Sequence, residues 1–177
     1  MKQCPVESKY LKHVPEKGCP GSFWQDRGDR YHCGIDIYVP FGTNVFSIDN
    51  GIVIEIGVFT SPKKVPYWNV TKYIIIKNQD NFYCKYAELD EVFVSIDEQV
   101  KAGQKIGVVG NVLNLKKINK NSPKYIMNLK KNINQSMLHF ELYDSRPLEN
   151  CKYLGGNWHG KTKPKNLMDP QIKLKLD

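Results

Sequence analysis

Residues 136–143 read Ser-Met-Leu-His-Phe-Glu-Leu-Tyr, a stretch in which apolar and polar side chains alternate. Successive side chains of a β-strand point to opposite faces, so this alternation predicts a strand with one face in the core. His139 then shares its face with Met137 and Glu141, whereas the leucine and phenylalanine between them point into the core. A histidine in this setting has either a structural role or a place in a functional site on the outer face.

A second stretch, His32-Cys33-Gly34-Ile35-Asp36, has the form HxxxD. Two imidazoles and one carboxylate can hold a zinc ion from three sides and leave a fourth position open for water or substrate. His32, Asp36 and His139 are therefore the candidate metal ligands, and they lie so far apart in the chain that only the fold can bring them together. The structural alternative is that Asp36 is simply the hydrogen-bond partner of His32.

The rest of the chain carries the strand and turn signals of a mainly antiparallel β protein. At 177 residues, with 41% hydrophobic and 25% charged residues, the chain is long enough for one domain with a hydrophobic core. Runs of β-branched and aromatic residues predict strands at 44–47, 52–56, 73–77, 82–86, 106–110 and 136–143. Asn50-Gly51 predicts a hairpin turn between the first two of these runs.

Proline, glycine, lysine and polar residues dominate residues 1–30, and we expect an irregular lead-in before a single domain at 31–177. Residues 111–135 contain six lysines and no acidic residue, which predicts a basic loop inserted before the last ligand strand. The alternative is a solvated insertion without a function. Residues 1–4 contain no apolar run, so we expect neither a signal peptide nor a membrane span in this chain.

The chain is basic, with 26 lysine and arginine residues against 18 acidic residues and a formal net charge of +8. Such a charge favours anionic partners, among them peptidoglycan and other wall polymers, sulfated glycans and membrane surfaces. The sequence contains no nucleic-acid-binding motif, and we expect no nucleic-acid partner. The simpler interpretation of the charge is a soluble, lysine-rich surface.

Six short motifs occur in an order that resembles the lysostaphin/LytM-type zinc endopeptidases. They are His32–Asp36, Pro40–Val45, Asn50–Val53, Tyr86–Leu89, Val100–Asn111 and Leu138–Leu142, with a closing Asn166–Pro170. The resemblance implies an antiparallel β-sheet of the duplicated hybrid motif type, with an open zinc groove and long loops, in proteins that cut the peptide cross-links of peptidoglycan. It also implies that His32, Asp36 and His139 bind Zn²⁺.

Two positions depart from that family, whose active members carry a further histidine at each. Glu88 lies in the segment Tyr86-Ala87-Glu88-Leu89 where the family has a histidine, and Met137 lies where a histidine opens the HxH motif. By resemblance, those histidines orient the attacking water and stabilise the oxyanion. A methionine thioether donates no hydrogen bond. The Glu88 carboxylate is a candidate general base, but as an anion it would repel a developing oxyanion.

The five cysteines contain no CxxC pair, so we expect no cysteine zinc site. Cys4 and Cys19 both lie in the lead-in and are candidates for a disulfide within it. The chain also resembles the secreted leukocyte cell-derived chemotaxin, and this likeness implies a Cys84–Cys151 disulfide. Cys33 directly follows a candidate ligand. Its alternatives are a free thiol near the metal and a further ligand, and the second is disfavoured because three better-matched ligands are present.

Three hypotheses follow for the function. The first is a zinc-binding, catalytically degenerate domain, a pseudoenzyme that holds a peptidoglycan fragment, another anionic glycan or a protein partner in its groove. The second is an active zinc metalloendopeptidase with Glu88 as general base, and the third is a secreted, chemotaxin-like signalling protein. All three place the protein outside the cell with its signal peptide removed. Tyr86, Tyr67 and Trp68 are the expected groove residues, and the last two have the alternative of covering the core edge.

Overall fold

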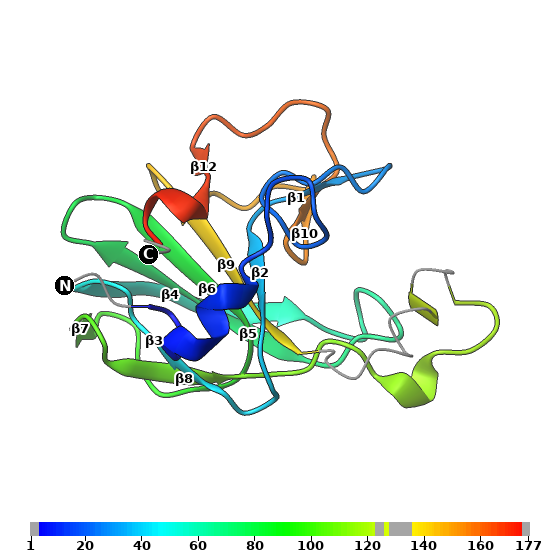
Figure 1. The fold of residues 1–177 in the computed structure, drawn as a ribbon, viewed down its shortest axis with the longest axis horizontal. Helices are drawn as coiled ribbons and strands as arrows, with labels where there is room; N and C mark the ends of the chain where they lie inside the picture. The colour runs from blue at the N-terminus through cyan, green and yellow to red at the C-terminus, as the bar shows by residue number, and fades with distance from the viewer. Residues whose placement is uncertain (1–3, 123–125, 128–135, 175–177) are drawn as a thin grey trace.

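A computed structural model of the chain describes residues 4–122, 126–127 and 136–174 (Figure 1). Its strands and short 3₁₀ helices follow one another as η1 (Ser8–His13), β1 (Tyr31–His32), β2 (Ile35–Tyr38), β3 (Asn44–Phe46), β4 (Gly51–Thr60), β5 (Thr71–Asn78), β6 (Tyr83–Val92), β7 (Gln99–Val100), β8 (Lys105–Val109), η2 (Leu115–Lys117), β9 (Met137–Tyr143), β10 (Tyr153–Leu154), β11 (Asn157–Trp158), β12 (Leu167–Met168) and η3 (Pro170–Ile172). The expected β-rich class is confirmed.

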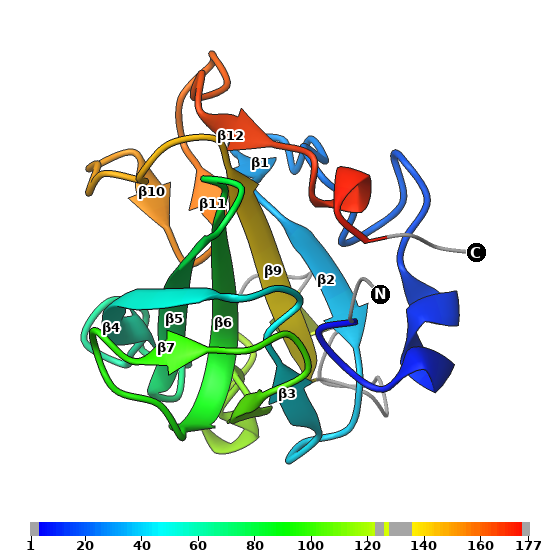
Figure 2. The same ribbon diagram turned by 90° about the vertical axis from the view of Figure 1, so that its left-hand side faces the viewer.

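Nine of the strands form one antiparallel sheet, in which β12, β9, β6, β5, β4 and β7 lie in that order. β2 pairs with β9, and β8 pairs with both β3 and β6. The long strands β9, β6, β5 and β4 lie side by side in Figure 2. β1, β11 and β10 form a separate three-stranded sheet, which lies at the same end of the large sheet as β12 (Figure 2).

Strand β9 separates the hydrophobic core from the face that carries the candidate site. The apolar residues of β9 are fully buried in the main cluster, as their alternation predicted (Leu138, Phe140, Leu142). Ile35 and Ile37 of the neighbouring β2 enter the same cluster with no exposed surface. Each such side chain contributes about 1.5–3 kcal/mol by its burial. His139 and Glu141 occupy the opposite face of this well-anchored strand.

The predicted hairpin at Asn50-Gly51 is wrong. β3 pairs with β8, whereas β4 begins at Gly51 and pairs with β5 and β7. Gly51 lies inside the ladder, where a Cβ would come within 2.5 Å of the carbonyl oxygen of Lys77. The glycine is therefore needed for close strand contact, and the chain does not reverse between β3 and β4.

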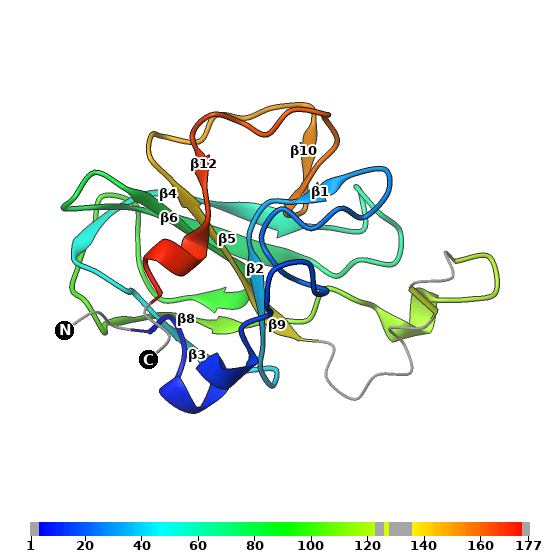
Figure 3. The ribbon, with the colours of Figure 1, turned by 45° about the horizontal axis from the view of Figure 1, so that its top comes forward.

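The lead-in is attached to the domain at several points along its length. Val6 is buried in the main cluster, and the backbone N–H of Phe46 donates a hydrogen bond of 2.9 Å to the carbonyl of Pro5. η1 lies against β2, as Figure 3 shows at the front of the molecule. The backbone N–H of Asp36 donates a 2.9 Å hydrogen bond to the carbonyl of Gly21. A domain boundary at residue 30 stays a prediction.

Neither of the expected disulfides is formed. Cys84 is fully buried in the main core cluster, Cys151 is exposed, and both are free thiols. Lys85, the next residue of β6, is the one that faces the connection containing Cys151, so a bridge from Cys84 would have to cross the sheet. Cys19 is also a free, exposed thiol, which excludes the expected bridge to Cys4.

The described part of the insertion at 111–135 extends away from the sheet (Figures 1 and 3). It has a small hydrophobic cluster of its own (Leu113, Ile118, Ile126). Three of its six lysines, Lys116, Lys117 and Lys120, are exposed, and the other three lie outside the described residues. Among the helices that the structure describes, none is long and apolar enough to cross a membrane.

Candidate metal centre

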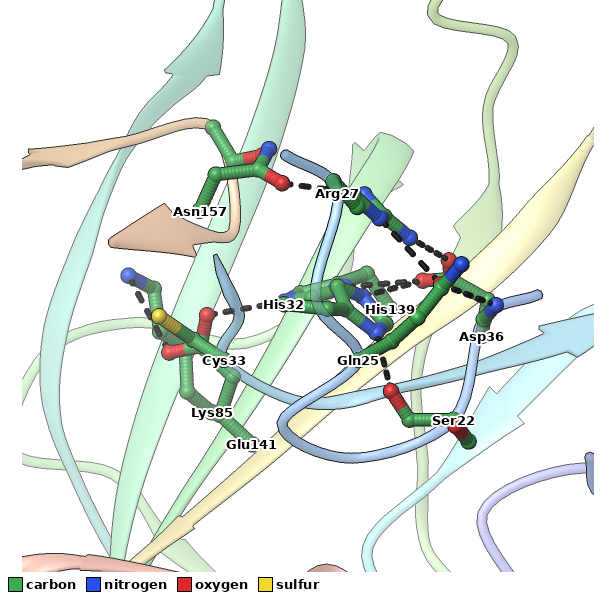
Figure 4. Close-up of polar contacts among 12 residues, drawn as sticks. Ser22, Gln25, Arg27, His32, Cys33, Asp36, Lys85, His139, Glu141 and Asn157 are labelled. Carbon is green, nitrogen blue, oxygen red and sulfur yellow. Dashed lines mark hydrogen bonds and ion pairs between the residues drawn. The ribbon is translucent and has the colours of Figure 1, made fainter. Parts of the chain in front are cut away.

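Three side chains direct one donor atom each toward a common point: Nε2 of His32, Oδ1 of Asp36 and Nδ1 of His139 (Figure 4). The distances are 3.1 Å from His32 to Asp36, 3.1 Å from His32 to His139 and 2.9 Å from His139 to Asp36. The side chains are buried, with residue exposures of 1%, 5% and 2% in chain order. The fold thus brings the three predicted ligands together. They are buried inside the protein, whereas the family resemblance implied an open groove.

Strand pairing fixes two of the three ligands. His139 stands opposite Asp36 of β2 on one side and opposite Ala87 of β6 on the other. His32 comes from β1, and the chain turns into β2 at Gly34. A Cβ on Gly34 would overlap the carbonyl oxygen of Phe140. The absence of a side chain at this position therefore lets the HxxxD segment approach β9 closely.

The lead-in supplies the outer partners of His32 and Asp36. Nδ1 of His32 donates a 2.9 Å hydrogen bond to the carbonyl of Ser22, which leaves Nε2 as the acceptor nitrogen toward the metal position. Nη2 of Arg27 lies 3.2 Å from Oδ2 of Asp36, and Nη1 of the same guanidinium donates to Oδ1 of Asn157 at 2.9 Å. Asp36 is therefore held so that one oxygen faces the guanidinium and the other faces the two imidazoles.

His139 has its outer partner on the other side of the site. Its Nε2 donates a 2.8 Å hydrogen bond to Oε1 of Glu141, which leaves Nδ1 as the acceptor nitrogen. The ring of Phe59 stacks on the imidazole at a centroid distance of 5.4 Å. Each of the three donor groups therefore has a fixed orientation, with its donor atom directed at the same point.

These contacts set the protonation of the three groups. Burial alone would raise the pKa of Asp36, but the two imidazoles hold it well below its usual range. Burial lowers the pKa of His32, although the negative charge of Asp36 acts to raise it. Burial would also lower the pKa of His139, but its hydrogen bonds to Asp36 and Glu141 raise it to about 9. Asp36 and His32 are therefore in the states that a metal requires, and His139 must release a proton.

Glu88 lies beside this site at an irregularity of β6. Lys72 pairs with Leu89 and Tyr73 pairs with Ala87, so Glu88 is skipped in the ladder and adopts a φ of 65°. Its Oε2 is buried and has no hydrogen-bond partner among the described residues. Burial and then the nearby charge of Asp36 raise the pKa of Glu88 to about 8.

Met137 occupies the other position where the family resemblance predicts a histidine. It stands opposite Tyr38 in the β2–β9 register and is half-buried, two residues before His139 on the same face of β9. Met137 and Glu88 thus both lie on the strands that flank or carry His139.

The expected groove residues do not line a groove together. Tyr86 belongs to the core, where it is fully buried and its hydroxyl accepts a 3.0 Å hydrogen bond from the backbone N–H of Ile48. Tyr67 and Trp68 pack against the hydrophobic cluster of the insertion. The Trp68 ring also lies where a Cβ on Gly155 would be. These contacts agree with the alternative of covering an edge.

A cavity of about 860 Å³ adjoins the candidate site on the same face of the sheet. Its wall includes Phe59, which stacks on His139, and Cys33, which is a buried free thiol. Lys85 and Tyr153 also line it, and both were missed by the sequence analysis. The alternation of β6 places Lys85 on the face of Ala87 and was a usable signal, whereas Tyr153 lies in the two-residue strand β10, for which the sequence offers no such signal.

Asp36 and His139 on one face of the large sheet, with His32 from β1 beside them, form a donor set of the kind that metallohydrolases use to hold a divalent metal. Residues 30–150 match Peptidase family M23, and the chain belongs to this family. Members of the family are zinc metallopeptidases, and the resemblance drawn from the six motifs is confirmed.

Curated relatives match over part of the chain. An 80-residue segment is 32% identical to an uncharacterized metalloprotease of Buchnera aphidicola, which covers 45% of this chain and 19% of that protein. A 79-residue segment is 33% identical to the peptidoglycan DD-endopeptidase ShyB of Vibrio cholerae, which covers 45% of this chain and 17% of that protein. The chain therefore matches less than a fifth of the length of these relatives.

Solved structures match over nearly the whole chain. The catalytic domain of lysostaphin from Staphylococcus simulans aligns with a TM-score of 0.56 at 19% identity, over 96% of this chain and 98% of that one. LytU aligns with a TM-score of 0.52 at 21% identity, over 90% of this chain and 81% of that one. These likenesses show that the fold is shared.

Proposed function

We propose that the chain is a zinc-binding M23 domain that has lost the hydrolytic chemistry of its family and binds a peptidoglycan fragment at its metal site. The observation that carries the proposal is one combination of residues. A complete His-Asp-His donor set is kept, while Glu88 and Met137 stand beside it in place of two histidines.

The donor set fits zinc. Ligands at about 2.0–2.1 Å from a tetrahedral ion lie about 3.3 Å from one another, close to the 2.9–3.1 Å between these donor atoms. Two imidazole nitrogens and one carboxylate oxygen are ordinary zinc ligands, and each one here has an outer hydrogen-bond partner. A bound zinc ion supplies Lewis acidity that polarises a carbonyl oxygen.

The residues next to the ligands are poorly suited to hydrolysis. Met137 cannot donate a hydrogen bond to a developing oxyanion. Glu88, with a pKa near 8, is mostly protonated in the metal-free protein at neutral pH, and a nearby cation lowers that pKa. Once ionised, Glu88 accepts a proton but repels the oxyanion. Loss of one oxyanion donor costs about 10²–10³ in kcat, and two are replaced here.

Peptidoglycan is the proposed partner because of the relatives and the charge. The matched ShyB of Vibrio cholerae is named as a peptidoglycan DD-endopeptidase. A net charge of +8 favours an anionic polymer. Such a partner also places the protein outside the cell. Another anionic glycan or a protein partner is the alternative occupant, and the chemotaxin-like signalling role rests on the sequence resemblance alone.

A metal analysis joined to a cleavage assay tests the proposal. Purified protein is assayed for zinc content, for release of peptides from peptidoglycan and from oligoglycine, and for sedimentation with peptidoglycan. We expect one zinc per chain, no peptide release, and binding that weakens in His139→Ala but not in Met137→Leu. Peptide release by the unaltered protein, or the absence of zinc, would contradict the proposal.

A second candidate is an active endopeptidase with Glu88 as general base. It is favoured by the buried Oε2 of Glu88, which has no hydrogen-bond partner within the described part of the chain. A buried polar atom without a partner is costly, and a catalytic role would explain why it is retained. In this case peptide release is expected from the unaltered protein and is lost in Glu88→Gln. Glu91→Gln is the matched control, since Glu91 is an exposed acid of the same strand.

A further inference from the structure

A buried cluster of polar groups lies behind His139, on the side away from the metal position (Figure 4). Glu141 is its centre: it is fully buried and accepts the 2.8 Å hydrogen bond from Nε2 of His139. The hydroxyls of Tyr143 and Tyr153 each donate to the same carboxylate at 2.6 Å. Lys85 stands opposite Glu141 in the β6–β9 register, with Nζ 3.7 Å from Oε2.

Lys85 is itself enclosed. Its Nζ donates a 2.8 Å hydrogen bond to the hydroxyl of Tyr153 and lies over the rings of Tyr73 and Tyr153, at 4.7 and 4.2 Å from their centroids. Burying two opposite charges is costly, and replacing such a pair by apolar residues is often neutral or stabilising. Fold stability alone therefore does not account for this pair.

The cluster controls which nitrogen of His139 is available. A neutral imidazole carries its proton on one nitrogen only, and the other nitrogen can bind a metal. The acceptor at Nε2 draws the proton to that side and leaves the lone pair of Nδ1 facing His32 and Asp36. Gly156 closes one side of the ring, since a Cβ there would lie 2.6 Å from Nε2.

We infer that Glu141 is a positioning residue of the metal centre, which holds His139 in the orientation and tautomer that ligation through Nδ1 requires. Lys85, Tyr143 and Tyr153 in turn hold the Glu141 carboxylate in place. This inference rests on the proposed zinc site. The competing account is that Glu141 is only the counter-ion of Lys85.

Two double variants separate these accounts at equal net charge. Lys85→Met/Glu141→Gln keeps a hydrogen-bond acceptor for Nε2 of His139, whereas Lys85→Met/Glu141→Leu removes it. Neither variant contains a buried unpaired charge. Glu55→Gln is the control for an acid on the same cavity wall, because Glu55 accepts from the hydroxyl of Tyr73. Zinc dissociation constants are measured by chelator competition, and the cobalt-substituted proteins are compared by visible absorption.

We expect the leucine variant to bind zinc about 10- to 100-fold more weakly than the unaltered protein, the usual effect of losing an outer-shell partner. The glutamine variant should retain most of the affinity, and Glu55→Gln should match the unaltered protein. Equal zinc affinity in the two double variants would overturn the inference and leave the proposed zinc site standing. Failure of the unaltered protein to bind zinc would instead remove the proposed function.

A spectroscopic measurement on the unaltered protein gives a second test that needs no substitution. In the zinc-loaded form, two-bond ¹H–¹⁵N spectra should show His139 with a protonated Nε2 and a metal-bound Nδ1. The Nε2 proton should exchange slowly with solvent, because it is hydrogen-bonded to a fully buried carboxylate. A metal-bound Nε2, or an Nε2 proton in fast exchange, would overturn the inference.

Discussion

The carbonyl oxygen of Ser22 lies 2.9 Å from Nδ1 of His32, so a residue of the lead-in determines which nitrogen of a candidate ligand faces the metal position. Ser22 precedes the segment at 30–150 that matches the family. Gly21 and Arg27, which also belong to the lead-in, contact Asp36. The orientation of two candidate ligands therefore depends on residues outside the matched region. Substitutions of these residues should change the properties of the metal centre.

Removal of the Arg27 guanidinium should destabilise the metal-free protein. Arg27→Met leaves Oδ2 of the buried Asp36 without its charged donor, and we expect a loss of about 1–2 kcal/mol in the free energy of unfolding. Arg146→Met is the matched control, because the Arg146 side chain is 57% exposed and pairs with Glu55 at 3.6 Å, and it should cost under about 1 kcal/mol. Urea denaturation in the presence of a chelator measures both. Equal losses would show that Arg27 contributes no more than a surface ion pair.

A methyl group at Gly156 should damage the metal centre. Gly156 and Gly28 both have positive φ, of 75° and 90°, so alanine is strained at each by about 1–3 kcal/mol. A Cβ at Gly156 would also come within 2.6 Å of the His139 ring, whereas a Cβ at Gly28 has open space. We expect Gly156→Ala to weaken zinc binding at least tenfold and Gly28→Ala to leave it unchanged. Zinc affinities are measured by chelator competition. Equal affinities in the two variants would show that a side chain at position 156 does not disturb the His139 ring.

The pH dependence of stability should reveal the burial of Glu88. Its pKa is about 8 in the folded protein against an ordinary value of 4.5. The folded state therefore binds more protons than the unfolded state between these two values, and the contribution of Glu88 to the free energy of unfolding falls as the pH rises from 4.5 to 8. In Glu88→Gln this contribution is absent.

The measurement compares the two proteins in urea at several pH values, with the metal removed by a chelator. The difference in unfolding free energy between Glu88→Gln and the unaltered protein should grow in favour of the variant as the pH rises. Parallel curves would mean that Glu88 has an ordinary pKa and faces water.

Restoring both histidines should restore cleavage if the zinc site is intact. Glu88→His/Met137→His supplies imidazoles at the two positions where the family resemblance expects them. We expect peptide release from peptidoglycan to rise at least about 100-fold over the unaltered protein. The same double variant carrying Asp36→Asn in addition is the control and should be inactive. A double variant that binds zinc but stays inactive would show that more than these two groups has been lost.

The alternation of β9 and the HxxxD segment were enough to predict the strand and to single out three candidate ligands, because each signal is local, whereas the assignment of these residues to zinc came from the order of the six motifs. Leu138 and Phe140 went to the core, and His139 went to the face of Asp36. The two departures, Glu88 and Met137, were likewise visible once the order of motifs was read. These predictions needed no knowledge of which strands pair.

The predictions that failed were those that depended on strand pairing. Gly51 resembled a turn residue but is required where β4 meets β5. Cys84 and Tyr86 face the core while their neighbour Lys85 faces the site. The alternation of β6 separates these two sets, but its pairing with β9 decides which of them faces the site. The contacts of Glu141 with Lys85 and with Tyr153 join three distant segments, so no local pattern in the sequence could have indicated them.

Strand β9 carries its ligand and its core residues on alternate faces, and this has a consequence for folding. A slip of one residue in its pairing would exchange the two faces, so that leucine and phenylalanine side chains would stand where His139 and Glu141 now stand. A chain in that register could not hold a metal ion. Zinc added during refolding should therefore select the correctly paired sheet, and the fraction of zinc-loaded chains would report how many molecules reached it.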